Sequence, residues 1–105
     1  MKYKCKQAIC QNYKLYPSVF PSWDNSPRRL KRPYLAFTGS TPELFKEWFE
    51  HVYTQFKPYS EDENLIFINA WNEWAEGCHL EPDLKNGTGF LEAVKSIIDK
   101  YSNSL

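Results

Sequence analysis

The chain has 105 residues, with 13 lysines and arginines against 13 aspartates and glutamates and no formal net charge. This length predicts a single domain at most. Zero net charge gives no global field that would gather nucleic acid or an anionic membrane. Because no apolar run approaches the roughly 18 to 20 residues that span a bilayer, we expect no nucleic-acid partner and no membrane span.

The cysteines and histidines indicate neither a disulfide framework nor a metal site. Cys5, Cys10 and Cys78 are too few and odd in number for a framework, which favours the reducing cytoplasm. Polar residues behind the basic N-terminus interrupt any apolar stretch, so no export signal is predicted. The spacing of Cys5 and Cys10 does not fit a zinc knuckle, and His51 and His79 lie far apart in the chain. We expect no metal and no organic cofactor.

The first predicted elements are a short strand and a helix. Residues 16–23 hold β-forming side chains bounded by prolines, which predicts a strand centred on Val19. Thr41 at the N-cap and Pro42 at the first helical position predict a helix start. Apolar residues then recur at spacings of three and four. Pro58 is expected to end this helix.

A second strand and a second helix follow. Residues 65–68 are apolar at every position, which is typical of a parallel strand covered on both faces. An amphipathic helix is predicted from about Thr88 or Gly89. The order strand, helix, strand, helix predicts an α/β fold with a βαβα unit and parallel pairing.

Two compositional features are ambiguous. Aromatic residues make up 17% of the chain, and their flat faces suit both core packing and stacking on a sugar ring. A basic loop follows the first strand and contains Arg28, Arg29, Lys31 and Arg32. It is either a solvated cationic turn or a place where an arginine grips a carboxylate, a phosphate or a sugar hydroxyl.

The chemistry is expected where the two parallel strands end, because ligands bind at the carboxyl ends of strands in such folds. Residues 23–29 and 72–77 occupy these positions, and the second segment carries Glu73 and Glu76. In a helical turn, residues three apart have Cβ atoms about 5 to 6 Å apart, close to the roughly 5 to 5.5 Å between the carboxyl groups of retaining glycosidases. One pKa of such a pair should rise and leave a proton donor. The alternative is two surface glutamates at a helix N-terminus.

Three ordered segments resemble the WbsX-type, glycoside hydrolase family 99-like proteins. They are WDNSPRR at 23–29, STPELFKEW at 40–48, and FINAWNEWAEG at 67–77, which is followed by LEPD at 80–83. The similarity extends over roughly residues 16–95, and three motifs in order are more specific than one short pattern.

The resemblance implies a (β/α)8 barrel in which residues 1–105 form a single partial domain, the last two βα units. Such a barrel takes about 250 residues, so this C-terminal βαβα portion is incomplete on its own. The barrel-facing side of residues 65–68 would have nothing to meet. The resemblance therefore implies that the missing N-terminal barrel portion is a possible partner.

The resemblance also implies site residues and a carbohydrate substrate. The related hydrolases are retaining, endo-acting α-mannosidases whose Asn-Glu-Trp-x-Glu-Gly motif supplies both catalytic carboxylates. By position, Glu73 would be the base that deprotonates the sugar 2-hydroxyl, and Glu76 the general acid/base at the glycosidic oxygen. The residues expected to bind sugar are Trp23, Asp24, Arg28, Asn72 and Trp74.

Three functions stay open at this point. The first is a fragment of a carbohydrate-active enzyme of bacterial polysaccharide metabolism, inactive without the missing part of the barrel. The second is a glycosyltransferase-like protein of lipopolysaccharide or O-antigen biosynthesis, which the absence of an Asp-x-Asp motif disfavours. The third is a non-catalytic remnant or a sugar-binding module that uses its aromatic residues.

Overall fold

The structure, a computed structural model, describes residues 13–26 and 36–102. Cys5, Cys10 and the basic loop with Arg28 lie outside the described residues. Two helices alternate with two strands as predicted, and a hairpin of two further strands was not predicted. In chain order the elements are β1 (Ser18–Val19), α2 (Pro42–Gln55), η2 (Glu61–Glu63), β2 (Phe67–Ile68), β3 (Asn72–Glu73), η3 (Trp74–Glu76), β4 (Cys78–His79) and α3 (Gly89–Ser102), where η denotes a 3₁₀ turn.

The two strands β1 and β2 form the predicted parallel pair. Ser18 lies opposite Phe67 and Val19 opposite Ile68. The pairing continues beyond the strands, because the backbone N–H of Asn69 donates a 2.9 Å hydrogen bond to the carbonyl oxygen of Val19. The side chain of Val19, at the centre of the predicted strand, is fully buried. The carboxyl ends of both strands therefore lie at the same edge of this small sheet.

Helix α2 begins where its capping residues predict. The Oγ1 atom of Thr41 accepts a 3.1 Å hydrogen bond from the backbone N–H of Leu44, and Pro42 occupies the first helical position. The cap satisfies one of the backbone donors that have no partner at a helix start, and proline has no such donor to lose. The helix ends before Phe56, two residues short of Pro58. The predicted bounds are thus close to the observed ones.

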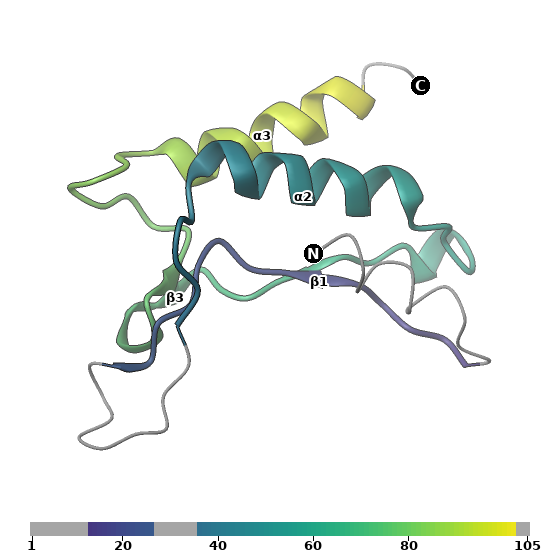
Figure 1. The fold of residues 1–105 in the computed structure, drawn as a ribbon. Coiled ribbons are helices and arrows are strands. Elements are labelled where there is room, and N and C mark those ends of the chain that lie inside the picture. The colour runs from purple at the N-terminus through teal and green to yellow at the C-terminus, as the bar shows by residue number, and fades with distance from the viewer. Residues whose placement is uncertain (1–12, 27–35, 103–105) are drawn as a thin grey trace.

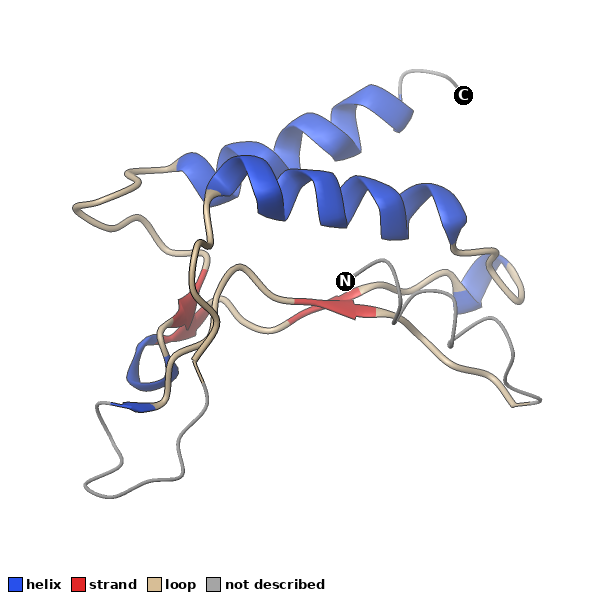
Figure 2. Ribbon diagram, viewed as in Figure 1, coloured by secondary structure: helices blue, strands red, loops and turns tan. Residues whose placement is uncertain are grey.

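Helices α2 and α3 pack side by side over one face of β1 and β2 (Figures 1 and 2). At their N-terminal ends Gly89 lies against Pro42, and a Cβ atom on Gly89 would come within 2.7 Å of Pro42 Cγ. Glycine therefore permits the close start of the two helices. The core lies between the helices and the strands and consists of Val19, Phe45, Phe49, Val52, Leu80, Phe90, Ala93 and Ile97. Within the described part of the chain, no helix is both long and apolar enough to cross a bilayer.

Among the described residues no helix lies on the opposite face of the sheet, so the prediction that residues 65–68 are buried on both faces is wrong for this chain. Ile66 and Ile68 pack against the core. Leu65 and Phe67 point the other way, as alternation along a strand requires, and they are 45% and 55% exposed. The physical reason is that both helices lie on one side of the strands.

A groove lies beside β2, where residues from both helices and from the segment before β2 surround about 430 Å³ of space. Most of the residues that line it have apolar side chains. The lining residues are Phe49, Tyr53, Phe56, Pro58, Asn64, Ile66, Ile68 and Ile98.

Candidate functional site

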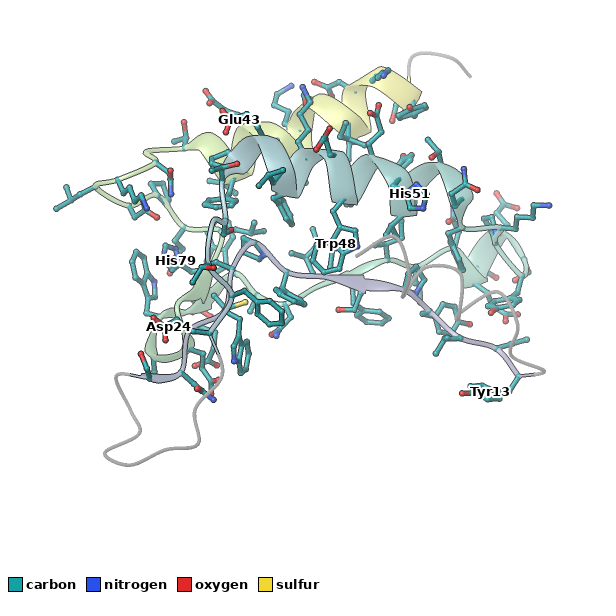
Figure 3. The ribbon with its side chains drawn as sticks, in the orientation of Figure 1. Tyr13, Asp24, Glu43, Trp48, His51 and His79 are labelled. Atoms are coloured by element: carbon teal, nitrogen blue, oxygen red, sulfur yellow. The ribbon has the colours of Figure 1, made fainter. Side chains whose placement is uncertain are left out.

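The two segments that follow β1 and β2 meet, as expected for the carboxyl ends of parallel strands. The backbone N–H of Asp24 donates a 2.7 Å hydrogen bond to the carbonyl oxygen of Glu76. The hydroxyl of Ser22 donates to the carbonyl oxygen of Gly77. Figure 3 shows Asp24 and His79 at the same end of the molecule, far from Tyr13. This end holds the candidate site.

The backbone around the two glutamates differs from the predicted helical turn. Glu73 is the last residue of β3, and Glu76 is the last residue of the 3₁₀ turn η3. Strand β3 pairs in antiparallel fashion with β4, so that Glu73 lies opposite Cys78. The turn closes through Gly77, whose φ of +57° lies in the left-handed region that glycine adopts most readily. The two glutamates therefore belong to a hairpin, not to one helical face.

A buried thiol, that of Cys78, lies in the same hairpin as the two glutamates. Cys78 is fully buried, and its Sγ donates a 2.6 Å hydrogen bond to the carbonyl oxygen of Asn69. Burial raises the pKa of the Cys78 thiol, and the negative charges of Glu73 and Glu76 raise it further. The thiol stays protonated at neutral pH, which agrees with a packing role and not with a nucleophile. Of the two glutamates, Glu73 is exposed and Glu76 half-buried.

Asp24 is held as an anion beside this hairpin. Its Oδ1 atom accepts hydrogen bonds from the hydroxyl of Ser26 at 2.6 Å and from the backbone N–H of Ser26 at 2.9 Å. These two bonds, the hydroxyl first, lower the pKa of the Asp24 carboxyl below its usual value. A carboxylate that stays ionised can accept a hydrogen bond from a hydroxyl but cannot donate a proton. Asp24 is therefore suited to binding and not to general acid catalysis.

The tryptophans of the site differ in what they present to solvent. The indole nitrogen of Trp23 is buried and has no hydrogen-bond partner among the described residues. It is thus not available to a ligand hydroxyl in this conformation. Trp71 and Trp74 are 54% and 50% exposed, respectively. These two side chains offer aromatic surface at the strand ends.

The side chain of Trp74 is fixed by residues that the sequence analysis did not assign. Its ring stacks on the imidazole of His79, with centroids 3.6 Å apart and planes 13° from parallel. Its Nε1–H donates a 2.7 Å hydrogen bond to Oε1 of Glu81. Glu81 lies within the sequence motif at 80–83 and His79 directly precedes it. Their contacts with Trp74 could be predicted only once the β3–β4 hairpin is known.

Comparison with known proteins supplies the family. A model of the family described as Glycosyltransferase WbsX matches residues 1–94. The chain belongs to this WbsX family. Two relatives, each named Uncharacterized protein WxcX, come from Xanthomonas campestris pv. campestris strains B100 and ATCC 33913. Each relative is 35% identical to this chain over 96 residues, which are 90% of this chain and 14% of the relative.

The WbsX chain thus spans 14% of the length of these curated relatives. No solved structure matches the chain. Among the described residues of the WbsX chain, no group of three or more histidine, cysteine, aspartate or glutamate side chains is arranged to hold a metal ion.

The structure brings most of the predicted WbsX site residues to one end of the fold. Asp24 and Glu76 are joined through their backbones, and the β3–β4 hairpin carries Glu73 next to Trp74. Asn72 is exposed and pairs with His79 across the hairpin. Trp23 and Asp24 belong to one segment, which pairs through its backbone with the segment at residues 36–37.

Proposed function

We propose that this chain is the C-terminal βαβα portion of a (β/α)8 barrel and that it carries the acid/base pair of a carbohydrate-active enzyme, Glu73 and Glu76. The observation that carries the proposal is the 2.7 Å hydrogen bond between Asp24 and Glu76, because it joins the segments that follow the two parallel strands. In parallel α/β folds these strand ends are where ligands bind. WbsX membership supports a carbohydrate as the ligand.

The uncovered surfaces support the barrel. A two-stranded parallel sheet leaves one open edge on each strand, and such edges are normally paired or covered. Leu65 and Phe67 expose apolar surface on the side away from the helices, where the interior of a barrel would lie. The remaining strands would pair with β1 and β2 and bury these side chains. We call this chain together with that remaining portion the complete protein.

The proposed chemistry divides the work between the two carboxylates. Glu76, half-buried, would donate a proton to the glycosidic oxygen as its bond to C1 breaks. Glu73, exposed at the end of β3, would accept the proton of the substrate's own 2-hydroxyl as the 2-oxygen bonds to C1 in place of the leaving sugar. Water would then attack C1 and give its proton to Glu76, while Glu73 returns its proton to the 2-oxygen as the bond between that oxygen and C1 opens. Asp24, held ionised by Ser26, would accept a hydrogen bond from another hydroxyl.

Glycosyl transfer is the second candidate, and the family's name favours it. In this reading the protein would take part in the assembly of a surface polysaccharide such as lipopolysaccharide or O-antigen, in the cytoplasm as the cysteine content predicts. The same acid/base pair could serve transfer if an acceptor hydroxyl takes the place of water. The whole sequence contains no Asp-x-Asp motif of the kind that metal-dependent nucleotide-sugar transferases often use.

Product analysis distinguishes these functions. The complete protein is incubated either with a mannose-containing oligosaccharide or with a nucleotide sugar and an acceptor oligosaccharide. Shortened oligosaccharides in the first reaction support hydrolysis, and lengthened acceptors in the second support transfer. Binding without turnover in both would support a non-catalytic sugar-binding module. We expect the 105-residue chain alone to be inactive, so turnover by the chain alone would contradict the proposal that it is incomplete.

A further inference from the structure

The Trp74 indole is held on two of its sides. One ring face lies on the imidazole of His79, 3.6 Å between centroids. The ring N–H is bound to the carboxylate of Glu81 at 2.7 Å. Stacking alone would allow the indole to rotate in its plane, and the hydrogen bond alone would allow it to tilt. Together the two contacts fix the plane and the orientation of the ring.

His79 is itself held in place. Its Nδ1 atom lies 3.1 Å from the carbonyl oxygen of Glu81, and its Nε2 atom lies 3.7 Å from Oδ2 of Asp83. The side chains of His79 and Asp83 are only 12% and 18% exposed, respectively. The imidazole is thus a fixed support. Because it belongs to β4 and Trp74 follows β3, the support and the indole come from the two sides of one hairpin.

Trp74 nevertheless remains 50% exposed. Since His79 covers one ring face and Glu81 occupies the ring nitrogen, the exposed area belongs mainly to the other face and the benzo edge. A flat, apolar and pre-oriented surface of this kind suits the C–H face of a pyranose ring. Fixing the indole beforehand removes the cost of ordering it when a ligand binds.

We infer that His79 and Glu81 are positioning residues that hold Trp74 as a stacking platform for a sugar ring next to Glu73. The inference rests on the proposed function, because it takes a carbohydrate as the ligand. It adds the location of one sugar ring and two residues that shape its site without touching it. Trp74 begins the 3₁₀ turn that directly follows Glu73, so the platform belongs to the same hairpin as the carboxylate assigned to the substrate's 2-hydroxyl.

The experiment uses NMR of the 105-residue chain with ¹⁵N-labelled indole groups. The chain has four tryptophans, and the Trp74→Phe variant identifies the Trp74 signal by its disappearance. The probe is methyl β-D-glucopyranoside, whose equatorial hydroxyls leave C–H groups on both ring faces. Sorbitol, a polyol without a ring, is the matched control. We expect the glucoside to shift the Trp74 signal saturably and sorbitol to leave it in place.

Two pairs of variants test the support. His79→Ala should weaken glucoside binding roughly three- to tenfold, the size of one lost aromatic contact, whereas His79→Phe keeps a flat ring and should restore binding. Glu81→Ala should move the Trp74 indole signal and weaken binding, and Glu81→Gln, which keeps an acceptor, should do neither. If His79→Ala unfolds the chain, the Glu81 pair decides.

The inference is overturned if the glucoside leaves the Trp74 signal unchanged, or if the alanine variants bind as the unmodified chain does. This binding is measured without turnover. Its failure is therefore distinct from failure of the acid/base proposal, which is tested by activity.

Discussion

The backbone N–H of Asp24 donates a 2.7 Å hydrogen bond to the carbonyl oxygen of Glu76. The bond joins the segment after β1 to the turn after β3, so the position of Glu76 depends on a partner that is distant in the sequence. Gly77 closes this turn with a φ of +57°, which glycine adopts without strain, while a Cβ atom there would make only ordinary contact with Asp24, 3.4 Å from its Cβ, N and O atoms. The candidate site is thus built on backbone contacts and one glycine.

Replacement of Gly77 by alanine tests this arrangement. Alanine at φ of +57° should cost about 1 to 2 kcal/mol, the penalty of a left-handed conformation for a residue with a Cβ atom. Gly87→Ala is the matched control, since its φ is +56° but nothing lies within 4 Å of the added atom. Thermal unfolding should show similar losses of stability for both variants.

Activity of the complete protein should separate the two glycine variants. We expect Gly77→Ala to lower it, because the left-handed strain falls on the residue that directly follows Glu76, and Gly87→Ala to leave it unchanged. Equal activity in both variants would show that the Asp24–Glu76 contact does not position the site.

Phe67 tests the proposed barrel. In the isolated chain its side chain is 55% exposed and keeps one edge-on ring contact, with Tyr16, so Phe67→Ala should lower the free energy of unfolding by only about 0.5 to 1.5 kcal/mol. In the complete protein the same side chain should be in the core, where Phe→Ala costs about 3 to 5 kcal/mol. Denaturant unfolding of both forms measures the difference.

Ile97, which is 1% exposed in the isolated chain, provides the control for Phe67. Ile97→Ala should cost about 2 to 5 kcal/mol in both forms, as at any buried isoleucine. A small loss for Phe67→Ala in the complete protein as well would mean that this face stays uncovered, against the barrel proposal.

Local signals predicted the helices and the parallel pair well. Thr41 and Pro42 determine the start of α2 through hydrogen bonding and φ, and the apolar spacing determines its buried face. The β3–β4 hairpin was missed because its strands, Asn72–Glu73 and Cys78–His79, carry no apolar pattern of the kind that marks β1 and β2, and because its turn depends on Gly77 in the left-handed region. The Trp74–His79 stack was missed for the same reason, since it joins two sides of that hairpin. The uncovered side of Phe67 could not be predicted from an apolar pattern alone, because burial depends on which segments are present.

The pH dependence of stability should reveal the contact between α2 and α3. Lys100 and Tyr101 donate hydrogen bonds of 2.6 and 2.8 Å to Oε2 of Glu50. These bonds, that of Lys100 first, lower the pKa of the Glu50 carboxyl below its usual 4.5. The folded state therefore binds a proton less readily than the unfolded state. The stabilisation is fully present above the unfolded-state pKa and is lost as pH falls through the lower folded-state pKa.

Glu50→Gln should accordingly be less stable than the unmodified chain at neutral pH and should approach it in stability well below pH 4.5. Glu47→Gln, an exposed change on the same helix, serves as the control and should show no such convergence. Urea unfolding at several pH values measures this. A stability difference for Glu50→Gln that persists unchanged into strong acid would assign its effect to packing and not to charge.

The most direct test of the central claim is the turnover of aryl glycosides by variants of the complete protein. The test variants are Glu76→Gln and Glu73→Gln, and the control is Glu61→Gln, an exposed change in η2. Loss of a general acid or base should lower kcat by roughly 10²- to 10⁴-fold, whereas Glu61→Gln should be unaffected. A dinitrophenyl leaving group needs no proton, so it should restore much of the glycosidic-bond cleavage of Glu76→Gln and none of that of Glu73→Gln. Wild-type turnover in either glutamate variant, or equal rescue of both, would contradict the assigned acid/base roles.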